Sequence, residues 1–188
     1  SQAASLPASP LQNGSLRLFR LFGVDVFLHW SWVLVAMYQI TRNRTRGAGA
    51  GLEYALILSI AEYLAIFAIV LVHEFGHALA CKSVGGVAER IVLWPLGGLA
   101  FVQPPERPGA LLWAIAAGPL VNVILLPLTI LPAMALGAFA SHNTLLTTFL
   151  FELAVINVVL LVFNMLPVYP LDGVQILSPK TVQRFSRN

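Results

Sequence analysis

The chain has 188 residues, of which 58% are hydrophobic and only 10% are charged, and its formal net charge is +3 at pH 7. Soluble domains carry about 25% charged residues, so this composition excludes a conventional soluble enzyme, a disordered tail and a nucleic-acid-binding domain. The basic residues form no block that could follow a phosphate backbone. A lipid bilayer is the expected environment, and the chain is short enough to form a single bundle of a few helices.

The predicted elements begin after residues 1–14, which we interpret as a disordered leader or an expression remnant. Residues 15–27 alternate between apolar and polar side chains, as a strand does. Four apolar stretches are long enough to be membrane-spanning candidates, at about 24–40, 52–80, 109–140 and 144–166.

Prolines and glycines modify this pattern at two places. The third stretch contains Pro119, Pro127 and Pro132 and is expected to be kinked or broken. Residues 88–102 carry Gly97 and Gly98 near their middle and predict two short strands around a turn, which can pair with residues 15–27. The predicted fold is therefore an all-α polytopic membrane protein with about four transmembrane helices and a short membrane-associated β-hairpin or sheet.

The distribution of basic residues predicts an orientation. With four spans, eight basic residues fall on the side of the termini and of the loop between the second and third spans, and three fall on the other side. Cytoplasmic loops are enriched in Lys and Arg, so both termini are expected in the cytoplasm. Arg42, Arg44 and Arg46 on the other side argue mildly against this orientation.

The second span ends in the sequence His73-Glu74-Phe75-Gly76-His77. Residues at i and i+4 lie on one face of a helix, so the two imidazoles can converge on one zinc ion, while Glu74 can act as a general base towards an attacking water. A polar cluster that only packs the bundle is the alternative. Ionisable groups at membrane depth are costly and usually functional, which favours the metal site.

Asp172 is the candidate for a third protein ligand. In the predicted topology the second and fourth spans run in the same direction, so their C-terminal ends meet the same membrane face. The prolines after Asn164 break the helix and can turn Asp172 towards the bundle interior. An Asp-Gly pair also fits a plain turn.

At these motifs the chain resembles the site-2 protease family of intramembrane zinc metalloproteases. Within that family it looks most like the compact prokaryotic branch that includes sporulation sigma-factor processing proteases. The resemblance covers about residues 17–177 and rests on four motifs: HEFGH (73–77), LWPLGGLA (93–100), AAGPLVN (116–122) and NMLPVYPLDG (164–173).

The resemblance implies a role for each motif. His73, His77 and Asp172 would bind one zinc ion and Glu74 would be the catalytic base. Substrate binding would involve four residues, Gly97, Gly98, Asn122 and Asn164.

It also implies a single metalloprotease core at 15–177, followed by a polar tail at 178–188 that is interpreted as truncated. The active site would lie near the cytoplasmic side. The expected partners are the lipid bilayer, a membrane-anchored protein substrate, and a regulatory membrane protein or a second copy of the chain, with no nucleic acid. The reaction would be hydrolysis of a peptide bond in or near a transmembrane segment of a regulatory protein.

Two other functions stay open at this stage. The chain could be a catalytically inactive relative that binds or chaperones membrane helices. It could also be a membrane metallopeptidase of the prenyl-protein type, in which Glu152 would replace Asp172 as the third ligand. Glu62 and Glu152 otherwise have no assigned role, and Glu62 is expected to be a buried polar partner facing the bundle interior.

Overall fold

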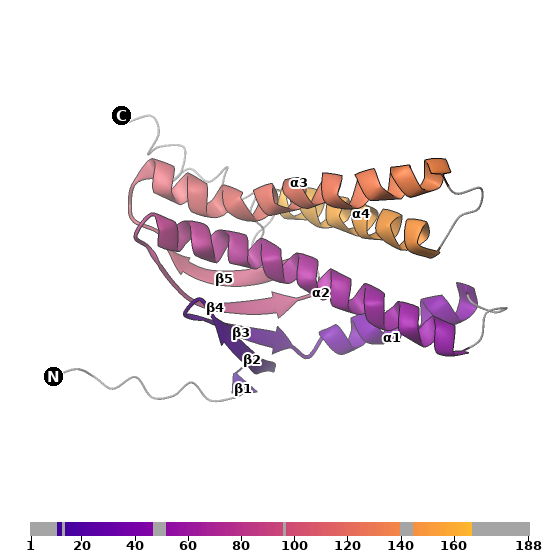
Figure 1. Ribbon diagram of the computed structural model, residues 1–188. Helices are drawn as coiled ribbons and strands as arrows, with labels where there is room; N and C mark the ends of the chain where they lie inside the picture. The colour runs from indigo at the N-terminus through magenta and orange to yellow at the C-terminus, as the bar shows by residue number, and fades with distance from the viewer. Residues whose placement is uncertain (1–10, 13, 47–51, 96, 140–144, 167–188) are drawn as a thin grey trace.

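The computed structural model describes residues 11–12, 14–46, 52–95, 97–139 and 145–166. These residues form four helices and five strands (Figure 1), which confirms the predicted fold class. The helices are α1 (Trp32–Arg46), α2 (Leu52–Ser83), α3 (Pro108–Phe139) and α4 (Leu145–Asn164). The strands are β1 (Leu11–Gln12), β2 (Ser15–Leu21), β3 (Val24–His29), β4 (Val87–Trp94) and β5 (Gly97–Gln103).

Within the described ranges, three helices are long and apolar enough to cross a membrane, with candidate spans at Leu56–Ser83, Pro108–Gly137 and Leu146–Asn164. The first predicted span, 24–40, is wrong as a single helix. Its first part is strand β3, and α1 has only 15 residues, or about 22 Å of helix. A short apolar run fits a buried strand as well as a helix, and here the alternating burial of β3 shows which one formed.

The five strands form one sheet in the order β1-β2-β3-β4-β5. Strands β2 and β3 form an antiparallel hairpin, as do β4 and β5, which confirms the two predicted strands in 88–102. The two hairpins join through parallel pairing of β3 with β4, where Asp25 lies opposite Arg90. Leu11 and Gln12, inside the segment interpreted as a leader, pair with β2 as strand β1.

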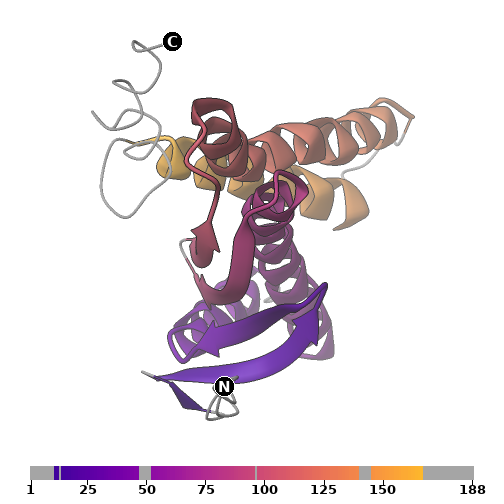
Figure 2. The same ribbon diagram turned by 90° about the vertical axis from the view of Figure 1, so that its left-hand side faces the viewer.

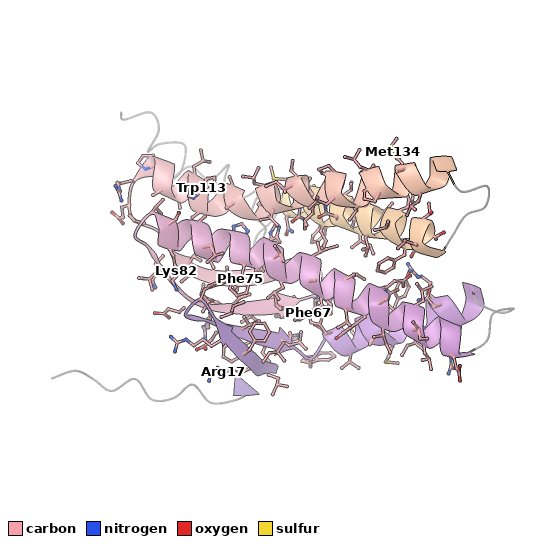
Figure 3. All side chains as sticks on the ribbon, viewed as in Figure 1. Arg17, Phe67, Phe75, Lys82, Trp113 and Met134 are labelled. Atoms are coloured by element: carbon pink, nitrogen blue, oxygen red, sulfur yellow. The ribbon has the colours of Figure 1, made fainter. Side chains whose placement is uncertain are left out.

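Helix α2 lies at the centre of the molecule. The sheet and α1 lie on one side of it, and α3 and α4 lie on the other (Figures 1 and 2). Phe75 and Phe67 face the sheet and α1 from α2 (Figure 3): Phe75 belongs to the core formed with Val26 and Ile91, and the Phe67 ring meets that of Trp32 edge to face at 5.6 Å. Helix α2 is thus held along both its faces.

The prolines of α3 do not break it. The helix continues from Pro108 to Phe139 through Pro119, Pro127 and Pro132, so of the two predicted alternatives, a kink or a break, the break is wrong. Each proline removes one backbone hydrogen bond, but neighbouring helices and local adjustment make this tolerable inside a membrane bundle.

Helices α2 and α3 lie close together around Gly76. A Cβ atom at Gly76 would lie 2.8 Å from the carbonyl oxygen of Ala117 and 2.9 Å from Cγ2 of Val121. Small residues of this kind let helix backbones approach in membranes, where packing drives association. The absence of a side chain at Gly76 therefore sets the spacing of the two helices that carry the site described below.

We expect Gly76→Ala to lower the free energy of unfolding by about 1–3 kcal/mol, because the new methyl group meets a backbone carbonyl that cannot move without shifting α3. Thermal unfolding of the purified chain in detergent measures the effect. Gly109→Ala is the matched control, since a Cβ there has no atom within 4 Å. Equal stability of the two variants would contradict the role given to Gly76.

Candidate metal centre

The site begins with the C-terminal half of α2, where the HEFGH sequence lies in a continuous helix. His73, Glu74 and His77 are 2%, 3% and 6% exposed, respectively, so three ionisable side chains are withdrawn from solvent within one helical turn. The Nε2 atoms of His73 and His77 lie 3.2 Å apart. The predicted convergence of the two imidazoles is thus present in the fold.

The other ring nitrogens have oxygen partners on α3. Nδ1 of His73 lies 2.8 Å from Oδ1 of Asn122, and Nδ1 of His77 lies 2.8 Å from the carbonyl oxygen of Ala114. A carbonyl oxygen only accepts hydrogen bonds, so Nδ1 donates and Nε2 of the neutral ring presents its lone pair. Hydrogen bonding of this kind is what orients histidines that bind metals.

This donor set fits a zinc ion. Two imidazole nitrogens bound to tetrahedral zinc at 2.0–2.1 Å would be about 3.3 Å apart, close to the 3.2 Å between the Nε2 atoms. Within the described residues, no group of three His, Cys, Asp or Glu side chains is arranged to hold a metal. Asp172, the predicted third ligand, lies outside the described residues.

Gly118 makes room for this arrangement. A Cβ atom on Gly118 would overlap the ring of His77, including its Nε2 atom. Gly118 lies four residues after Ala114, so the missing side chain lets the imidazole pass over α3 and reach the Ala114 carbonyl. The backbone acceptor at Ala114 has no side-chain signature by which the sequence could reveal it.

Glu74 points from α2 to the sheet. Its Oε1 atom lies 4.0 Å from Nε2 of His73, and a Cβ atom on Gly98 would overlap its carboxylate. The backbone of β5 therefore runs directly against this carboxylate. Only glycine at position 98 permits that contact, which places the Gly-Gly pair of the LWPLGGLA motif beside the HEFGH motif.

The remaining predicted residues also gather here. Asn164, the last residue of α4, is buried, and a Cβ on Gly97 would lie 3.3 Å from its Oδ1. Asn122 is fully buried, and its backbone carbonyl accepts a hydrogen bond from Nδ2 of Asn157 on α4 at 2.7 Å. Four elements, α2, α3, α4 and β5, thus meet around the two histidines.

The fold and this pair of histidines define a class: proteins with several long apolar helices, one of which carries two buried histidines beside a buried glutamate. The architecture matches the solved structure of the site-2 protease from Methanocaldococcus jannaschii with a TM-score of 0.65 and 28% sequence identity. The match covers 87% of this chain and 69% of that one.

Sequence comparison gives the family. The model of Peptidase family M50 matches residues 61–139 and 127–186. A zinc metalloprotease of M. jannaschii is 30% identical over 165 residues, which cover 88% of this chain and 45% of that relative. The chain belongs to Peptidase family M50. It spans less than half the length of the curated relatives it matches.

We expect Gly118→Ala to weaken zinc binding by at least about tenfold, the usual loss when a residue that positions a metal-binding histidine is disturbed. The added methyl group would displace the ring of His77. Zinc affinity is measured by competition with a chelator. Gly137→Ala, on the same helix, is the control, because its Cβ would meet Thr147 at an ordinary 3.8 Å. If both variants bind zinc as the parent does, the proposed fit of His77 is wrong.

Proposed function

We propose that this chain is the catalytic core of an intramembrane zinc metalloprotease that hydrolyses a peptide bond in or near a transmembrane segment of a membrane-anchored regulatory protein. The observation that carries the proposal is the convergence of the His73 and His77 Nε2 atoms beside a buried glutamate. Membership of Peptidase family M50 and the likeness to a solved site-2 protease support it.

In this proposal His73, His77 and Asp172 hold one zinc ion. When bound, zinc lowers the pKa of water towards about 7 and polarises the scissile carbonyl. Glu74 takes a proton from the attacking water and delivers it to the leaving amine. Asn122 holds the ring of His73 in the required tautomer through the hydrogen bond to Nδ1. This contact gives Asn122 a positioning role beside the substrate-binding role expected from the sequence.

The substrate must be extended at the site, because the carbonyl groups of a transmembrane helix are occupied by backbone hydrogen bonds. Strand β5 has β4 as its strand neighbour on one side and stands at the edge of the sheet. An unwound segment paired with this edge would gain main-chain hydrogen bonds. It would also lie next to Glu74, which Gly98 of β5 already touches. Gly97, Gly98 and Asn164 would then contact the substrate backbone.

The proposal includes a placement in the cell. Both termini and the active site lie on the cytoplasmic side, following the excess of basic residues there. The motifs favour the branch that contains the sporulation sigma-factor processing proteases. A regulatory membrane protein or a second copy of the chain would act as a further partner.

Glu74→Gln tests the catalytic role. We expect the variant to keep its zinc and to lose cleavage of a membrane-anchored substrate by at least about 100-fold, because general-base catalysis contributes 10²–10⁴-fold. Product formation in detergent or proteoliposomes is the measurement, and retained zinc shows that the site is intact. Cleavage by Glu74→Gln at the parent rate would contradict the proposal. A parent that binds zinc and membrane helices but never cleaves would favour the inactive relative.

A second comparison identifies the third ligand. Asp172→Ala should lower the zinc content of the purified chain, whereas Glu152→Ala should not, because Glu152 bonds to Arg42 on α1. Metal analysis after dialysis separates the two. Loss of zinc in Glu152→Ala but not in Asp172→Ala would favour a metallopeptidase of the prenyl-protein type.

A further inference from the structure

A second cluster of ionisable groups lies in the same bundle, towards the N-terminal end of α2. Nη2 of Arg42, on α1, donates to Oε2 of Glu62, on α2, and to Oε2 of Glu152, on α4, at 2.8 Å each. Glu62 precedes His73 by eleven residues on the same helix, which is about 16 Å of rise. The cluster therefore stands apart from the two histidines and joins three helices.

The cluster carries an excess of negative charge. Two ionised carboxylates and one guanidinium have a net charge of −1. The side chains of Glu62 and Glu152 are only 1% and 15% exposed. An uncompensated charge at this depth is strongly unfavourable. One additional positive charge removes the imbalance. A divalent ion would instead leave a charge of +1 next to the guanidinium, so the charge count favours a monovalent cation.

Uncharged side chains supply a second, independent indication. Asn43 and Gln39 lie one helical turn apart on α1 and are 1% and 2% exposed. Nδ2 of Asn43 donates to Oε2 of Glu62 at 2.9 Å, which fixes the Asn43 amide inside the cluster. Among the described residues, Oδ1 of Asn43, Oε1 of Gln39 and Oε1 of Glu62 have no hydrogen-bonding partner. Buried oxygens without donors are the groups that a proton or a hard cation satisfies.

We propose that the Arg42–Glu62–Glu152 cluster is a binding site for one monovalent cation, a proton or a sodium ion, and that the bound cation stabilises the junction of α1, α2 and α4. A proton would sit between the two carboxyl groups, which the shared guanidinium draws together. A sodium ion would take ligands from the carboxylate and amide oxygens. Among the residues that the structure describes, the charged and titratable groups that face this site are Arg42 and Tyr38 on α1, Glu62 on α2 and Glu152 on α4, with the Tyr38 ring 6.0 Å from the guanidinium carbon.

The test compares Glu152→Gln with Glu53→Gln in the zinc-loaded full chain in detergent. Glu152→Gln leaves Arg42 and Glu62 as a neutral pair, so no cation is needed. Glu53→Gln removes the same charge from an exposed position on α2. Thermal unfolding is followed from about pH 6 to about pH 9 in choline chloride and in sodium chloride at equal ionic strength.

The two cations give different outcomes. If the site holds a proton that the unfolded chain has released, the folded-to-unfolded ratio falls about tenfold per pH unit as the pH rises, in both salts. If it holds sodium, sodium chloride raises the unfolding midpoint saturably at high pH and choline does not. In both cases Glu53→Gln follows the parent, and Glu152→Gln loses the dependence.

Either of two results overturns the proposal. One is a dependence on pH and sodium that is the same in Glu152→Gln and Glu53→Gln. The other result comes from the parent chain alone, so it does not require a folded variant. In that case the unfolding midpoint of the parent does not respond to pH or to sodium, and its infrared spectrum has no carbonyl band from a protonated carboxylic acid. Because unfolding is the readout, these results are independent of proteolytic activity.

Discussion

The close contact between α2 and α3 is the constraint on which the rest of the structure depends. Gly76 of α2 lies against Ala117, and Gly118 of α3 lies under the ring of His77, so each helix has a glycine where atoms of the other helix occupy the place of a side chain. A side chain at either glycine would push the two backbones further apart. The imidazoles would then lose Asn122 and the Ala114 carbonyl, their two oxygen partners on α3. Helix packing and the chemistry of the histidines therefore arise from the same contact.

Two clusters of buried ionisable side chains in the described part of the chain have opposite electrostatic character. Around His73 and His77, uncharged oxygen atoms accept hydrogen bonds from the two Nδ1 atoms. The lone pairs of the two Nε2 atoms then point towards one place, which favours a cation there. Around Glu62 and Glu152, a guanidinium already supplies one positive charge and leaves a deficit of one. A bilayer offers no water to relieve either arrangement. The scarcity of charge in the composition thus reflects how strictly each ionisable group must be matched.

Much of the fold and part of the site could be predicted from the sequence. Hydropathy located α2, α3 and α4 because long apolar runs have few other stable conformations in a membrane. The spacing of His73 and His77 defined their common face because helix periodicity is local. The first apolar run was misassigned because only Trp30 and Ser31 separate strand β3 from helix α1, and periodicity alone distinguishes the two elements poorly over so few residues.

Other features needed the tertiary structure. The acceptor of His77 is a backbone carbonyl, which any residue type could supply. Arg42 and Glu152 are 110 residues apart in the sequence, and no local sequence pattern predicts their contact. Asn122 could be identified as a polar residue in an apolar helix, but its hydrogen bond to His73 depends on the rotation of α3 relative to α2.

The parallel pairing of β3 with β4 has a consequence for how the molecule is assembled. The chain between these strands contains α1 and the whole of α2, so β3 and β4 can pair only after these two helices have folded back on each other. Until then the β2–β3 hairpin exposes an unpaired edge. Strand β5 pairs with β4 and lies against the carboxylate of Glu74, so this contact with the site also depends on the earlier packing of α1 against α2.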